Sequence, residues 1–202
     1  MSEALTSSEY MAATYRIALA ETTRAVLSIG RCSDGDRVIN YCAGTGEDNL
    51  AIAAAVAPTG VVYAVDVDPA KLSRLGVLAR AGGKADLVRP WPKDAMFAAD
   101  TPHVPTHIAC LFGLHRLSDP GLATRRWAEG CSPATKLLTA DWATPGDATL
   151  PAVSAAWTLV TSVTLEFPVP AMVPTARRSG DAPPPPRLMA SVVVREWTGT
   201  TR

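Results

Sequence analysis

Small residues form a turn, Ala43-Gly44-Thr45-Gly46, between a β-prone run and an alanine-rich helical segment. Because small side chains let backbone N–H groups approach a ligand closely, such a turn at the start of a helix is typical of a nucleotide or nucleoside site. Asp66 follows twenty residues after Gly46, at the predicted end of the next strand, where its carboxylate could accept hydrogen bonds from a ribose diol. These residues predict a nucleoside-containing ligand across the ends of two strands. The alternatives are an ordinary strand-to-helix turn for the glycines and a helix cap for Asp66.

The residues after the glycine turn indicate which nucleoside fits. A dinucleotide-binding turn has the pattern G-x-G-x-x-G, and Asn49 stands here in place of its third glycine. Glu47 and Asp48 also put two negative charges where a pyrophosphate would lie, which disfavours NAD but suits a cationic sulfonium ligand. A nicotinamide-dependent oxidoreductase is therefore the weaker interpretation.

Two side chains further along the chain could take part in catalysis. His115 follows the fourth predicted strand, at the edge of an α/β sheet where ligands bind, and its imidazole could accept a proton from an acceptor hydroxyl. Asp141 ends the fifth predicted strand and could line the pocket for the acceptor. The structural alternatives are that the imidazole of His115 only makes hydrogen bonds to the backbone and that Asp141 is an acid at a strand end without a role in catalysis. Tyr15 could close over the ligand from the first helix, although core packing is the simpler role for it.

The elements that must position these residues alternate between strand and helix. Strands are predicted over 37–42, 61–65, 85–88, 107–112 and 136–141, and helices over 8–30, 47–57, 69–81 and 119–129, with a helical turn near 93–99. This order implies a parallel sheet with helices on both faces. After a predicted helix at 150–157, β-prone runs at 158–167 and 188–197 flank a proline-rich loop. The expected fold is α/β and Rossmann-like, a seven-stranded, mostly parallel sheet with helices on both faces and a C-terminal antiparallel β-hairpin.

Three segments resemble motifs of a known family. Residues 38–46, V-I-N-Y-C-A-G-T-G, resemble the first motif of class I S-adenosylmethionine (SAM)-dependent methyltransferases, V-L-D-L-G-C-G-T-G. Residues 61–69 resemble the second motif, in which the ribose-binding acid corresponds to Asp66. Residues 107–120 resemble the fourth strand of the family and its exit, A-L-H-H-L-x-D-P. The resemblance covers about residues 10–142 and is closest to small-molecule methyltransferases of the ubiquinone/menaquinone-biosynthesis type.

The resemblance implies a cofactor and a reaction. The cofactor would be SAM, bound by residues of the first motif and of the second and fourth strand ends: Asn40, Cys42, Ala43, Gly44, Gly46, Asp66, Val67 and Phe112. The expected reaction transfers the methyl group of SAM to a small organic acceptor, and the protein mainly aligns the reactants and excludes water. His115 and Asp141 would then be the catalytic residues.

The sequence departs from the family pattern at several positions, of which three concern the cofactor site. Asn40 replaces the acid of the first motif, and Cys42 replaces its first glycine. Arg89-Pro90-Trp91 is predicted to stand where the family has the G-D-A that contacts adenine. These departures favour an alternative function, a methyltransferase-like protein that binds SAM or its product without methylating. Such a protein could carry out another reaction, such as a cyclisation, or serve as a structural or regulatory partner.

Composition and charge narrow the class of protein. The chain has 202 residues, no net charge and 48% hydrophobic residues, which indicates one globular domain without the basic excess that nucleic acid binding needs. The longest apolar run is too short to span a bilayer, and the N-terminal residues do not resemble a secretory signal. The four scattered cysteines lack metal-ligand spacing.

We therefore expect a cytoplasmic, single-domain protein that acts on a small molecule, with no metal and no nucleic acid or membrane partner. The sequence does not decide whether the protein is a monomer or a homodimer. The domain would comprise an N-terminal helical segment (1–33), a SAM-binding core (34–142) and a C-terminal helix and β-hairpin (143–202).

Overall fold

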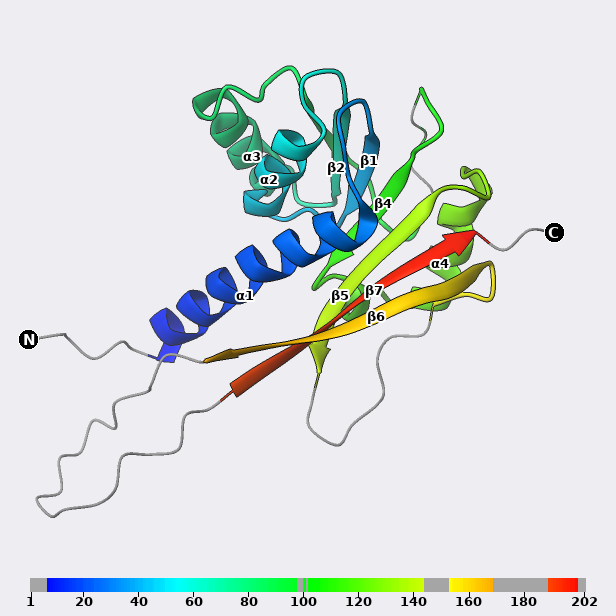
Figure 1. Ribbon diagram of the computed structural model, residues 1–202. Helices are drawn as coiled ribbons and strands as arrows, with labels where there is room; N and C mark the ends of the chain where they lie inside the picture. Colours follow the sequence, from blue (N-terminus) through cyan, green and yellow to red (C-terminus); the bar gives the residue numbers. More distant parts are fainter. Residues whose placement is uncertain (1–6, 98–99, 101, 144–152, 169–188, 200–202) are drawn as a thin grey trace, which may run out of the picture.

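The described residues form one seven-stranded sheet in the order β3-β2-β1-β4-β5-β7-β6 (Figure 1). The computed structural model describes residues 7–97, 100, 102–143, 153–168 and 189–199. Strands β1 to β5 pair in parallel, whereas β7 pairs antiparallel with both β5 and β6. The predicted mostly parallel sheet with a C-terminal antiparallel hairpin is confirmed. The strands are β1 (Arg37–Tyr41), β2 (Val61–Asp66), β3 (Val88–Pro92), β4 (His107–Leu111), β5 (Lys136–Ala143), β6 (Trp157–Pro168) and β7 (Met189–Gly199).

Helices cover both faces of the sheet. They are α1 (Ser7–Gly30), α2 (Glu47–Ala55), α3 (Pro69–Ala81) and α4 (Pro120–Glu129). The first three pack on one face and α4 packs on the other (Figure 1). Successive residues of β1, Val38 and Ile39, enter these two cores, as expected for a parallel strand buried on both sides. On the α4 face, Trp127 stacks on Tyr41 with ring centroids 4.1 Å apart.

Aspartate caps define the starts of α3 and α4. The Asp68 carboxylate accepts hydrogen bonds from the backbone N–H groups of Ala70 and Lys71, and Asp119 accepts one from Leu122. A proline follows each cap, where its fixed φ suits the first helical turn. Because Asp68 caps α3, the neighbouring Asp66 is not needed for that role.

The third strand lies later in the chain than predicted. The prediction of a strand over 85–88 is wrong, because the carbonyl of Lys84 accepts hydrogen bonds from the N–H groups of Leu87 and Val88 and forms a turn there. The strand instead runs from Val88 to Pro92 at the edge of the sheet. Prolines are tolerated in an edge strand, because the outer side has no strand to bond. The chain leaves β3 at Lys93, which changes the assignment of the residues that follow.

The helix predicted over 150–157 is also wrong in its described part, whereas the helical turn predicted near 93–99 is found as a single turn. The residues after Lys93 make a single turn, in which Phe97 N–H donates to the carbonyl of Asp94, while residues 98–99 lie outside the described residues. Residues 153–157 form a turn that leads into β6, and 150–152 lie outside the described residues. The indole N–H of Trp157 donates to the carbonyl of Thr124, 2.8 Å away, so tertiary contact with α4 takes precedence over the alanine-rich helical pattern. No helix among the described residues is long and apolar enough to cross a membrane.

Candidate active site

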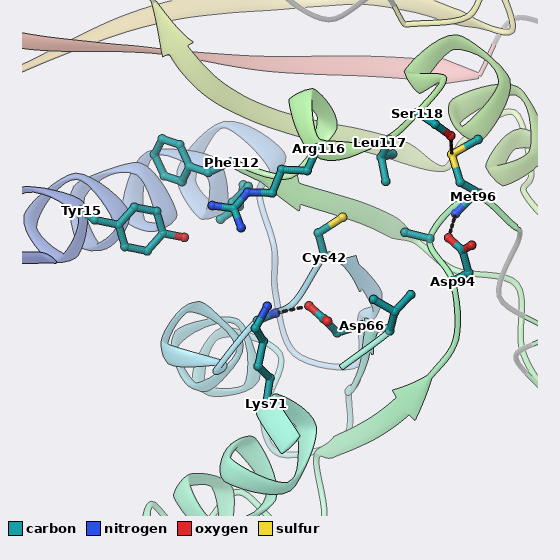
Figure 2. A pocket seen from close by; sticks show the side chains of 14 residues that line it. Tyr15, Cys42, Asp66, Lys71, Asp94, Met96, Phe112, Arg116, Leu117 and Ser118 are labelled. Carbon is teal, nitrogen blue, oxygen red and sulfur yellow. Dashed lines mark hydrogen bonds between the residues drawn. The ribbon is translucent and has the colours of Figure 1, made fainter. Parts of the chain in front are cut away.

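A cleft opens at the carboxyl ends of the central strands β2, β1 and β4 (Figure 2). Ligands of open α/β sheets bind at this edge, and a volume of about 440 Å³ is in the range of small-molecule sites. The lining comes from α1, from the exits of β1 to β4, from α3, and from the turn of 3₁₀-helix η1 (Leu114–Arg116) with the residues after it. The lining residues are Tyr15, Cys42, Gly44, Asp66, Val67, Lys71, Asp94, Ala95, Met96, Leu111, Phe112, Arg116, Leu117 and Ser118.

The two predicted glycines of the turn have different roles. Both have positive φ, 58° at Gly44 and 93° at Gly46. Gly44 lines the cleft, and the nearest atom to a Cβ placed there would be 4.0 Å away, so its surroundings are open to a ligand. Gly46 is buried, and a Cβ there would lie 2.2 Å from Cδ1 of Leu75. Gly46 therefore permits close packing of α2 against α3 and does not line the cleft.

Asp66 lies at the end of β2 with most of its side chain buried. Its two carboxylate oxygens accept hydrogen bonds from the N–H groups of Gly44 and Asp68, each 2.9 Å long (Figure 2 draws the bond from Gly44). A carboxylate has about four acceptor positions, so two remain for hydroxyl groups of a ligand in the cleft. Val67, beside it, is 65% exposed and offers an apolar surface.

The cleft continues to the turn after β3. Asp94 and Ala95 stand where the chain leaves the strand, and Met96 N–H donates to Oδ1 of Asp94 (Figure 2). The prediction that Arg89-Pro90-Trp91 replaces the adenine-contacting G-D-A is therefore wrong, because those three residues lie within β3. Asp94-Ala95 occupies the corresponding place after the strand. Asp94-Ala95 could have been recognised in the sequence as the match to D-A, but only if the edge strand had been predicted to end at Pro92.

Asn40, at the first-motif acid position, lies beneath the turn rather than in the cleft. It is fully buried, and its amide group donates to Oδ2 of Asp48 at 2.7 Å and to Oδ1 of Asn49 at 3.1 Å. An aspartate at position 40 would place a second carboxylate against that of Asp48. The carboxylate that the family has at the first-motif position is thus supplied here by Asp48, in α2. Ala43 is also buried behind the lining, with its N–H donating to the carbonyl of Val65.

The Asp48→Asn variant is expected to change how stability depends on pH. Burial raises the pKa of Asp48 from 3.8 to about 6. Because the folded protein then holds this proton more tightly than the unfolded chain, the contribution of Asp48 is most favourable below about pH 4. It is lost as the pH rises through about 6, at a cost of about 3 kcal/mol. The free energy of unfolding of the variant, relative to the wild type, should therefore rise by about 2–3 kcal/mol from about pH 4 to about pH 7.

Urea denaturation across this pH range measures the effect. Glu47→Gln is the matched control, because Glu47 is the exposed neighbour of Asp48 on the same helix turn. A stability difference between Asp48→Asn and wild type that stays constant with pH would show that Asp48 does not titrate as described.

The two predicted catalytic residues form a pair beside the cleft. Nδ1 of His115 lies 2.8 Å from Oδ1 of Asp141. Burial raises the pKa of Asp141, and the contact with His115 opposes this shift. Because a carboxylate accepts, Nδ1 of a neutral imidazole carries the proton and Nε2 is the acceptor. His115 is 43% exposed at its side chain, and neither residue belongs to the lining itself.

Aromatic residues close the end of the cleft near α1. Phe112 has a φ of 55°, and its ring centroid lies 5.5 Å from that of Tyr15 and 4.9 Å from that of Trp142. Cys42 lines the cleft between Asp66 and Arg116 (Figure 2), and a hydrogen bond with the buried Cys110 lowers the pKa of the Cys42 thiol. Among the predicted site residues, the structure thus brings Cys42, Gly44, Asp66, Val67 and Phe112 together in the cleft.

Comparison with solved structures identifies the fold. A SAM-dependent methyltransferase from Aquifex aeolicus is 17% identical, with a TM-score of 0.62 over 86% of this chain and 88% of that chain. TrmN from Thermus thermophilus is 18% identical (TM-score 0.63, 88% of this chain), and the [4+2]-cyclase SpnF is 17% identical (TM-score 0.61, 71% of this chain). The present chain spans 48% of TrmN and 58% of SpnF.

These likenesses confirm the predicted fold, that of class I SAM-dependent methyltransferases. No protein family model and no curated protein sequence matches the chain.

Proposed function

We propose that this protein binds SAM in the cleft and transfers its methyl group to a small organic acceptor in the cytoplasm. The observation that carries the proposal is the pairing of Asp66 and Gly44. A buried carboxylate with two unused acceptor positions faces the cleft next to an open glycine, which suits a ribose and the atoms attached to it. The turn with Asp94 and Met96 lies at one end of the same cleft, where an adenine would fit.

The residues of the cleft would mainly bind SAM and align it with the acceptor. SAM, when bound, supplies a methyl group that its sulfonium charge has already activated. Asp66 and Gly44 would hold the donor, while Tyr15 and Phe112 would exclude water from the end of the cleft where the acceptor enters. Where the acceptor is a hydroxyl, Nε2 of His115 would take its proton, with Asp141 holding the imidazole in the required tautomer.

Calorimetric titration tests the proposal. We expect SAM and its demethylated product, S-adenosylhomocysteine, to bind, and NAD not to bind, because Glu47 and Asp48 lie at the start of α2. No binding of SAM by the full chain would refute the proposal.

The alternative is a protein that binds SAM without methylating. The exclusion of His115 from the lining is the observation that favours it. Incubation with SAM and a panel of acceptors separates the two functions: methyl transfer releases S-adenosylhomocysteine, whereas binding without its release from any acceptor supports the alternative.

A further inference from the structure

Arg116 places its guanidinium at one end of the cleft. Its side chain leaves η1 and extends into the cleft toward Tyr15 (Figure 2). The other cation of the lining, Lys71, has Nζ 3.9 Å from Oδ2 of Asp68. Arg116 makes no side-chain hydrogen bond or ion pair with any residue in the described part of the chain. An unpaired guanidinium inside a cleft is a ready site for an anion.

The surroundings of Arg116 favour a carboxylate on an apolar body. A guanidinium presents parallel N–H donors that match the two oxygens of a carboxylate. The Tyr15 hydroxyl, on the side of the cleft that Arg116 faces, adds a further donor (Figure 2). The rings of Tyr15 and Phe112 form an apolar wall next to it.

Strand order indicates which ligand reaches Arg116. Neighbouring strands lie about 4.8 Å apart, and the order β2-β1-β4 separates Asp66 from the exit of β4 by two such steps. If Asp66 binds the ribose, Arg116 lies across the cleft from it, beyond Cys42. This is the part of the cleft where an acceptor would enter. A cationic donor and Arg116 would also repel each other unless an anion lies between them.

We propose that the acceptor carries a carboxylate, that Arg116 holds this carboxylate, and that the anion offsets the repulsion between Arg116 and the cationic donor. The inference rests on the proposed function, since it takes SAM as the donor. Because coupling between two bound ligands is reciprocal, a carboxylate should raise the affinity for SAM and SAM should raise the affinity for the carboxylate. S-adenosylhomocysteine has no sulfonium charge, so its affinity should not respond.

Calorimetry of the full chain with SAM and S-adenosylhomocysteine, with and without benzoate, tests the proposal. Without benzoate, Arg116→Gln is expected to raise the affinity for SAM about 3–10-fold, because it removes the repulsion, and to leave that for S-adenosylhomocysteine nearly unchanged. Benzoate should raise the SAM affinity of the wild type by a similar factor and have no effect on the variant. Benzamide, a neutral molecule of the same shape, should act on neither protein. Arg125→Gln, which removes an exposed arginine of α4 outside the cleft, is the charge-matched control.

Other outcomes overturn the inference. If Arg116→Gln weakens SAM and S-adenosylhomocysteine equally, Arg116 binds the carboxylate of the donor itself. The inference also fails if benzoate changes SAM affinity in both proteins or in neither. Failure of the wild type to bind SAM would instead refute the proposed function, so the two failures are distinguishable.

Discussion

Replacing His115 by alanine is expected to lower turnover with a hydroxyl acceptor by about 10²–10⁴-fold, the usual contribution of a positioned general base. The affinity for SAM should stay within a few-fold of the wild type, because His115 does not line the cleft. The physical reason for the loss is the 2.8 Å contact with Asp141, which holds the imidazole with Nε2 as its acceptor. Initial rates of S-adenosylhomocysteine release and calorimetry with SAM measure the two quantities separately.

Two further measurements distinguish a base from a structural residue. Asp141→Asn keeps the side-chain shape but removes the charge that orients the imidazole, so it should lower turnover less than removal of His115. Imidazole added to the buffer should partly restore turnover in the alanine variant, because it can enter the space left by the side chain. Full turnover in His115→Ala would mean that alignment alone accounts for the reaction and that His115 only packs against β5.

Replacing Asp66 by alanine is expected to reduce the affinity for SAM by about 10–100-fold, because the hydrogen bonds between a ribose diol and this charged group should contribute about 1.5–3 kcal/mol in total. The variant also loses the acceptor for the N–H groups of Gly44 and Asp68. The glycine turn should therefore become less ordered, which adds to the loss of affinity.

Asp66→Asn and Asp68→Ala are the controls for this experiment. Asparagine keeps one acceptor oxygen, so it should bind SAM with an affinity between those of the wild type and Asp66→Ala. Asp68→Ala removes the cap of α3 and the exposed ion-pair partner of Lys71 but leaves the Asp66 carboxylate in place, so it should lower stability by about 1 kcal/mol and change the affinity much less than Asp66→Ala. Unchanged SAM affinity in Asp66→Ala would contradict the assignment of the ribose position.

Much of the fold could be predicted because its determinants are local. The buried run at Val61–Asp66 and the Pro69–Ala81 helix, with Asp68 before its proline, carry their own strand and helix signals. The third strand could not be placed in this way. Its prolines argue against a strand unless it is known to lie at the edge, and the position of an edge follows from the order of all strands.

The sequence by itself determined the alternation of strands and helices, the turn of small residues at Gly44 and the position of Asp66 at the end of a strand. These depend on neighbouring residues and on the rule that ligands bind at the carboxyl edge of a parallel sheet. Only the tertiary structure decided that Arg116 faces Tyr15 in the cleft, that His115 meets Asp141, and that Asn40 bonds to Asp48 beneath the turn. Such contacts join residues far apart in the chain or on different elements, so they depend on strand order and on how each helix packs, which no local pattern specifies.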